Sequence, residues 1–372
     1  MGINRVAMFT PHTYKLAGEV EIFFTDSGPP PDSVDYTTVI ILHGSAFNGR
    51  KPPSSPSVIL DTRANTNTNA RGRTDGFEKL HEHAHSLNMR LLLWNRRDYP
   101  GSTKYTQAEL QDLVEGRKIF LDRLGHQLAD FILQFVEKED IPPATSDCTR
   151  GGITIMGWSM GTATAMSLFS DPQLLSPGAY AVLEKYVKDL VLDEAYKNFA
   201  FWVSSFFDHK SLESGNLVDM DIMKKRSDEP TISKWSKEEL IKWLTPEAGP
   251  RSEMPMYVEP MQNSLRNMTE RVFYDETLVK SYFPKVKVTV LFGTRSCWHA
   301  VWAALKTGKM YEEKISEGKR PRTLQIVKIE GGNHYVGALG GPKAFLGENG
   351  RGYGDTLSVQ QVEFYTYLDV LD

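Results

Sequence analysis

A serine flanked by two glycines stands between an apolar run and a helix-like segment. Residues 157–161 read G-x-S-x-G, directly after the apolar residues 153–156 and directly before the small-residue segment 162–169. A nucleophilic serine needs a tight strand-to-helix turn with a strained backbone, and the glycines on either side leave room for that turn. Ser159 is therefore a candidate nucleophile, and the backbone amide of Met160 is a candidate donor to an oxyanion.

Short apolar runs alternate with segments of helical spacing along most of the chain. Runs of strand length occupy residues 39–42, 90–94, 153–156, 190–192, 286–292 and 324–329. Apolar residues recur at helical spacing over residues 77–87, 110–136, 162–169 and 358–371. This alternation predicts an α/β fold with right-handed crossovers and a mostly parallel central sheet flanked by helices.

The alternation stops between about residues 196 and 283. That stretch has no clear strand, and it carries tryptophan, phenylalanine and methionine side chains among charged residues. We expect it to be a mainly helical insert that lies over the sheet. Its aromatic residues Trp202 and Phe206, together with Trp158 beside the candidate nucleophile, are expected to line an apolar pocket.

Two further signals follow strands, where catalytic loops of a parallel sheet are placed. His43, Gly44 and Ser45 follow residues 39–42, and the backbone amide of Ser45 is expected to be a second oxyanion donor. His334 follows a glycine-rich turn after residues 324–329, which favours a loop that reaches over the serine. The imidazole of His334 is therefore a candidate general base.

Taken together, the strand followed by His43 and Gly44, the serine turn at 157–161, the insert and the terminal His334 resemble the α/β-hydrolase superfamily. The resemblance implies an α/β-hydrolase core made of residues 1–195 and 284–372. It also implies a cap domain at residues 196–283, inserted after the sixth strand. The chain order of nucleophile, acid and histidine is the order that this family uses.

The acid departs from the pattern that the resemblance implies. The family commonly places an aspartate a few residues after the seventh strand, where this chain has Ser296. The family's known alternative places the acid at the end of the sixth strand, where Glu194 fits best and Asp193 is the second choice. Because adjacent residues of an extended segment point in opposite directions, only one of the two carboxylates is expected to face the histidine.

These residues predict a serine hydrolase that cleaves a small to medium apolar ester, lactone or thioester through an acyl-enzyme. Ser159, His334 and Glu194 would form its triad, and neither a metal nor an organic cofactor is needed. Acyl transfer and C–C bond hydrolysis use the same residues and stay open. A ligand-binding protein without catalysis on a hydrolase scaffold is a further alternative, which the missing carboxylate at Ser296 favours.

Composition excludes several other classes of protein. The chain of 372 residues has 43 Lys and Arg against 47 Asp and Glu, which gives a net charge of −4. It lacks the excess of clustered positive charge that is typical of nucleic-acid-binding proteins. Its two cysteines cannot form a disulfide framework. The sequence begins without the apolar core of a signal peptide, and no run reaches the roughly 20 residues of a membrane span. We therefore expect a cytoplasmic protein.

A competing metal motif occurs at residues 81–85, which fit H-E-x-x-H. On a helix, His81 and His85 would share one face, as zinc ligands of this motif do. The segment is polar, however, it lies on a predicted crossover helix away from the strand ends, and no third ligand stands out. We interpret it as a solvated helix face.

Overall fold

The computed structural model describes residues 10–45, 84–193, 204–221, 230–236, 240 and 243–334. Several sequence-based predictions lie outside these residues: Trp202 and Glu194, the helix at 358–371, and most of the helix at 77–87. Asp193 is the last residue of a described strand. The mainly helical cap expected at 196–283 is described in part.

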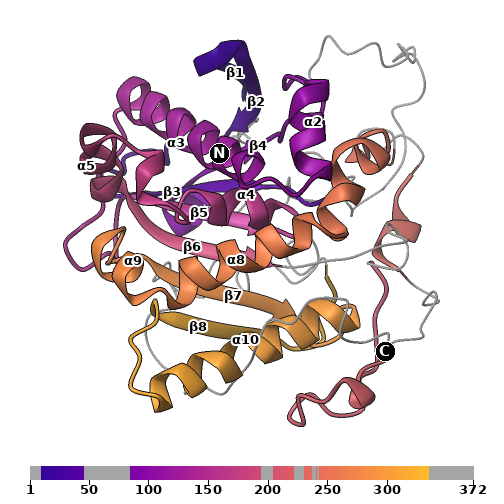
Figure 1. Ribbon diagram of the computed structural model, residues 1–372. Coiled ribbons are helices and arrows are strands. Elements are labelled where there is room, and N and C mark those ends of the chain that lie inside the picture. The colour runs from indigo at the N-terminus through magenta and orange to yellow at the C-terminus, as the bar shows by residue number, and fades with distance from the viewer. Residues whose placement is uncertain are drawn as a thin grey trace, which may run out of the picture.

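One sheet holds the described strands in the order β1-β2-β4-β3-β5-β6-β7-β8 (Figure 1). The strands are β1 (Thr10–Leu16), β2 (Val20–Asp26), β3 (Thr37–Leu42), β4 (Met89–Trp94), β5 (Ile153–Trp158), β6 (Val187–Asp193), β7 (Lys287–Gly293) and β8 (Leu324–Ile329). β2 pairs antiparallel with β1 and β4, and every pairing from β4 through β8 is parallel. This is the strand order of the α/β-hydrolase fold, so the predicted fold is confirmed.

The parallel strands are apolar because both faces of the sheet are covered. In β3, Ile40 and Leu42 belong to the main core cluster, whereas the alternate residues Val39 and Ile41 belong to a second cluster. Figure 1 shows α3 (Lys118–Glu139), α4 (Gly161–Ser167) and α8 (Met261–Tyr274) in front of the sheet. Buried side chains of these three helices complete the main cluster.

The helical pattern at 110–136 forms two helices instead of one. α2 (Gln107–Val114) ends before Gly116, and α3 begins at Lys118. Gly116 has a φ of +65°, and a Cβ at this position would lie 2.6 Å from the backbone carbon of Pro260. The left-handed conformation ends α2, and the close approach of the segment near Pro260 requires a glycine there.

The described part of residues 196–283 contains two kinds of structure. The described residues between 204 and 257 include loops and short turns, among them the π-helical turn η6 (Gly249–Glu253) and the 3-10 turn η7 (Met254–Tyr257). After these turns, α8 and α9 (Glu276–Ser281) contribute buried residues to the main core. The cap boundaries at 196 and 283 stay a prediction.

The described part of the chain also has α5 (Pro177–Tyr186), which precedes β6, and α10 (Trp298–Ser316), which packs on β7 and β8. Within the described residues, no helix combines the length and the apolar character that crossing a membrane demands.

Candidate active site

Ser159 occupies a strained turn between β5 and α4. Its φ is +54°, in the left-handed region that a residue with a side chain rarely adopts. A Cβ on Gly157 would lie 2.5 Å from the Cα of Thr162, and one on Gly161 would lie 2.0 Å from the carbonyl oxygen of Leu42. Glycine at both positions therefore lets α4 pack directly against β3 and β5, and the chain turns sharply at the serine.

His334 is brought to this turn from the C-terminal side of β8. Its ring stacks on the indole of Trp158, with ring centres 5.7 Å apart and planes inclined by 27°. The indole Nε1 donates a hydrogen bond to the backbone oxygen of His334 at 3.3 Å. The preceding Asn333 is buried and donates to Ser204 O at 2.7 Å and to Thr231 Oγ1 at 2.9 Å. These contacts fix the histidine beside the residue that directly precedes Ser159.

The imidazole of His334 faces Ser296 on its other side. Ser296 Oγ lies 3.4 Å from Nδ1 of His334, and both side chains are buried. Burial, followed by the nearby His299, holds the pKa of His334 well below its ordinary value of 6.5. The imidazole is therefore neutral near pH 7, which is the form that a general base requires.

The backbone of Ser296 is held by a second histidine that spacing alone did not single out. His209 accepts a hydrogen bond at Nδ1 from the Asp221 amide at 3.0 Å, so its Nε2 carries the proton. That Nε2 donates to the carbonyl oxygen of Ser296 at 2.8 Å. Burial lowers the pKa of His209, which keeps this neutral tautomer in place.

Of the two candidate acids, Asp193 is the last residue of β6, next to the serine turn. Asp193 pairs in register with Trp158, so β6 ends beside the residue that precedes Ser159. Glu194 lies outside the described residues. Its assignment as the acid, with Asp193 as the second choice, stays a prediction.

The predicted oxyanion loop packs against Ser159. A Cβ on Gly44 would lie 2.7 Å from Ser159 Cβ and 3.2 Å from Ser159 Oγ, so only a glycine fits at this approach. The backbone of Ser45 follows directly, and Met160 is the N-terminal cap residue of α4. Donation from the amides of Ser45 and Met160 to an oxyanion stays a prediction.

A buried polar network that the sequence did not predict surrounds this loop. Its centre is the carboxylate of Glu253 in η6, which is 2% exposed. Glu253 accepts hydrogen bonds from Ser45 Oγ, from Arg96 Nη2 at 2.8 Å and from Tyr99 Oη at 3.0 Å. The hydroxyl of Tyr257 in η7 lies 3.0 Å from Ser45 Oγ.

Arg96 connects this network to the strand that carries the loop. Its Nε donates to the carbonyl oxygen of His43 at 2.8 Å, and its backbone amide donates to Nε2 of His43 at 3.1 Å. The proton of His43 is therefore on Nδ1, which donates to Gly44 O at 2.9 Å. Burial, followed by the charge of Arg96, lowers the pKa of His43 well below 6.5, so this histidine holds the loop as a neutral group.

Trp158 is also part of an apolar cluster. It consists of buried residues from β5, the 204–244 region and the start of α10: Trp158, Phe207, Ile232, Trp235, Trp243, Cys297 and Ala300. Of the predicted pocket residues, Trp158 is in this cluster and Trp202 lies outside the described residues. The ring of Phe206 lies under the guanidinium of Arg295, 5.3 Å from its centre, while the adjacent Phe207 packs in the cluster. A pocket role for all three residues stays a prediction.

The H-E-x-x-H segment is described only at its end. His85 lies in the turn η2 (His85–Leu87), and its Nε2 lies 3.2 Å from Gly28 O. His81 and His83 lie outside the described residues. Among the parts of the chain that the structure describes, no three His, Cys, Asp or Glu side chains group as metal ligands.

The strand order is that of the α/β-hydrolase fold, with the strained serine directly after β5 and the histidine after β8. Solved structures with a related fold include a putative aryl esterase from Burkholderia cenocepacia, with 13% identity, a TM-score of 0.45, and coverage of 92% of this chain and 97% of that one. The thioesterase domain from the curacin biosynthetic pathway has 11% identity, a TM-score of 0.44, and coverage of 91% and 98% respectively.

A bromoperoxidase from Bacillus anthracis has 12% identity, a TM-score of 0.38, and coverage of 88% of this chain and 94% of that one. No family model matches the sequence, and no curated protein sequence is similar to it.

Proposed function

We propose that this protein is a serine hydrolase that cleaves a small to medium apolar carboxylic ester, lactone or thioester. The observation that carries the proposal is the strained Ser159 turn with His334 stacked on the adjacent Trp158. A positive φ at a serine between a parallel strand and a helix costs conformational energy, and such strain persists where it exposes a reacting group.

The reaction would proceed through an acyl-enzyme. Ser159 Oγ attacks the carbonyl carbon while Nε2 of His334 takes its proton, and the amides of Ser45 and Met160 bind the oxyanion. The tetrahedral intermediate collapses, and His334 passes the proton to the departing alkoxide or thiolate. Water, deprotonated by His334, then attacks the acyl carbon and releases the acid.

The apolar cluster beside Trp158 supports an apolar acyl group. Phe207, Ile232, Trp235 and Trp243 are each at most 9% exposed and offer no charged group to the nucleophile. For a hydrocarbon acyl chain that packs against this cluster, each methylene removed from water contributes about 0.8 kcal/mol to the free energy of binding. Activity is therefore expected to favour uncharged acyl chains.

The third member of the proposed triad is Glu194, with Ser296 as an additional contact to Nδ1 of His334. A carboxylate stabilises the imidazolium that forms during acylation, whereas a hydroxyl only orients the ring. The pKa of the free enzyme's general base sets the acidic limb of kcat/KM. Since the pKa of His334 is well below 6.5, activity is expected to persist below pH 6.5 and to fall as His334 becomes protonated.

Substituting Glu194→Gln is expected to lower kcat about 10²-fold, because Ser296 still orients the ring while the imidazolium loses its counter-ion. Removal of an anion also lowers the pKa of a histidine, so the acidic limb is expected to move to lower pH. The measurement is kcat and kcat/KM from pH 4.5 to 8. Asp193→Asn is the matched control and should leave the limb in place. An unchanged pH profile in Glu194→Gln would show that Ser296 alone contacts Nδ1 of His334 and that Glu194 is not the acid.

The proposal is tested by labelling with a fluorophosphonate, which reacts covalently with an activated serine. We expect one adduct per chain, located by peptide mass spectrometry at Ser159. The control variant Ser170→Ala removes a different buried hydroxyl, which donates to Ser167 O at 2.8 Å, and should label like the wild type. A folded protein without any adduct at Ser159 would instead indicate a ligand-binding protein without catalysis.

A further inference from the structure

The hydroxyl of Tyr257 lies beside the predicted oxyanion loop. It is 3.0 Å from Ser45 Oγ, and the Ser45 amide directly follows Gly44, which packs against Ser159. Among the described residues, Ser159 Oγ is buried without a hydrogen-bond partner, and Ser159 acts to lower the pKa of Tyr257 against the larger effect of burial. The phenol therefore approaches the serine turn from the side of the predicted oxyanion loop.

The direction of the hydrogen bonds follows from proton counting. A serine hydroxyl has a single proton, and Ser45 Oγ donates it to the carboxylate of Glu253. Towards Tyr257, Ser45 Oγ can only accept. The Tyr257 hydroxyl is therefore the donor of the 3.0 Å hydrogen bond in the resting protein.

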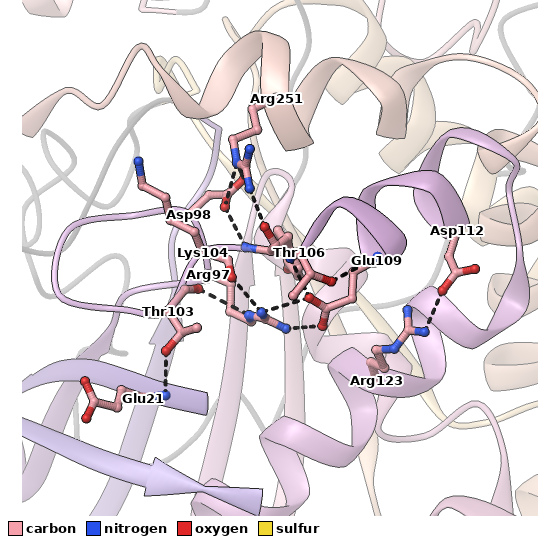
Figure 2. A network of polar contacts seen from close by, with 11 residues as sticks. Glu21, Arg97, Asp98, Thr103, Lys104, Thr106, Glu109, Asp112, Arg123 and Arg251 are labelled. Carbon is pink, nitrogen blue, oxygen red and sulfur yellow. Dashed lines mark hydrogen bonds and ion pairs between the residues drawn. The ribbon is translucent and has the colours of Figure 1, made fainter. Parts of the chain in front are cut away.

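Two ion pairs hold the turns that carry Tyr257. Glu253 binds Arg96, with Nη2 2.8 Å from Oε1, in a pair whose side chains are nearly fully buried. Arg251 binds Asp98, with Nε 3.0 Å from Oδ2, and also donates to the backbone oxygen of Tyr105. Figure 2 shows Arg251 reaching down to Asp98 on the loop after β4.

That loop is itself anchored to the core. Arg97 forms an ion pair with Glu109, and Glu109 also closes the capping box with Thr106 at the start of α2 (Figure 2). A donor that is held in position before reaction stabilises a developing charge without a reorganisation cost. The turns η6 and η7 therefore present the phenol of Tyr257 on a fixed support.

We infer that Tyr257 is a catalytic residue whose hydroxyl supplies a third hydrogen bond to the oxyanion, beside the amides of Ser45 and Met160. The inference rests on the proposed function. As the tetrahedral intermediate forms, the hydroxyl turns from the neutral oxygen of Ser45 to the negatively charged oxygen of the intermediate, which is the stronger acceptor. No proton is transferred, and the hydroxyl returns to Ser45 when the intermediate collapses.

The surroundings of Tyr257 keep its proton in place. Burial, and then the charge of Glu253, raise the pKa of Tyr257 above its ordinary value of 10. The phenol is therefore a neutral donor over the whole pH range in which His334 acts as a base. The side chains of Ser45 and Glu253 have a positioning role, because they orient the phenol and do not themselves contact the reacting atoms, whereas the backbone amide of Ser45 is the proposed oxyanion donor.

The substitution Tyr257→Phe is expected to lower kcat/KM for p-nitrophenyl esters about 10²-fold, the effect of removing one oxyanion donor. A trifluoromethyl ketone, which forms a tetrahedral adduct with an active serine, should lose affinity by the same factor. The matched control is Tyr274→Phe at the end of α8, which removes a hydroxyl that donates to Thr307 O of α10 at 3.3 Å. It should change neither quantity.

The outcomes separate this inference from the proposed function. If Tyr257→Phe retains kcat/KM within two-fold while the serine-dependent activity is present, Tyr257 is not a catalytic residue. A lower kcat/KM with unchanged affinity for the ketone would also overturn the inference. A hydroxyl that binds the oxyanion must contribute to the affinity for a tetrahedral adduct, so that result would indicate a merely structural role. Failure of the fluorophosphonate to label wild-type Ser159 would remove the proposed function itself. Thermal unfolding of each variant confirms that folded proteins are compared.

Discussion

Replacing Ser159 with alanine is expected to lower kcat for p-nitrophenyl ester hydrolysis by about 10⁴-fold or more. The substitution removes the only atom that forms the acyl-enzyme, and no other group can replace it in the strained turn. The backbone of the turn should persist, because Gly157 and Gly161 set the close packing and remain. Steady-state kinetics with a butyrate ester, at enzyme concentrations high enough to detect the residual rate, measures the effect.

The histidine provides an internal check on the same prediction. Residues that act as one unit are not additive, so Ser159→Ala, His334→Ala and the double variant should show similar residual rates. The variant Ser170→Ala should keep the wild-type rate. Full activity in Ser159→Ala would contradict the proposed mechanism, and a double variant far slower than either single variant would show that the two residues act independently.

The parts of the fold that the sequence could predict are those with local signals. β3, β4 and β5 are continuous apolar runs because neighbouring strands and both layers bury them, and the Gly157 and Gly161 pair is a steric requirement visible in the sequence. β1 was not predicted, because an edge strand that is mostly exposed has little hydrophobic pattern. The separation of α2 and α3 at Gly116 depends on the distant Pro260, which spacing alone cannot show.

The candidate site was predictable to the same degree. Ser159 and His334 belong to recognisable sequence motifs. The resemblance placed Ser296 at the position of the usual acid, and in the structure its hydroxyl contacts Nδ1 of His334. Glu253 and Tyr257 carry no motif, and they lie about a hundred residues from Ser159 in the chain. Their approach to the oxyanion loop depends on the ion pairs of Arg96 and Arg251, and these are tertiary contacts.

The largest expected effect on folding comes from Gly161→Ala at the start of α4. A Cβ there would lie 2.0 Å from the carbonyl oxygen of Leu42 and 3.0 Å from that of His43. Both are backbone atoms of β3 and its following loop, so no side-chain rotation can relieve the clash. Overpacking of a rigid core costs about 1–3 kcal/mol and more where backbone must move, and we expect the free energy of unfolding to fall by about 3 kcal/mol. Urea denaturation followed by tryptophan fluorescence measures it.

The same clash is expected to lower activity, because relief requires α4 to move away from β3 and to carry Ser159 away from the loop at Gly44. Gly178→Ala is the matched control, since Gly178 lies exposed in the first turn of α5 and a Cβ there meets nothing within 4 Å. That substitution should leave activity unchanged and raise the free energy of unfolding by up to about 1 kcal/mol, because alanine has less freedom in the unfolded chain. Equal stabilities of the two variants would show that α4 is not packed against β3 as tightly as the close approach at Gly161 requires.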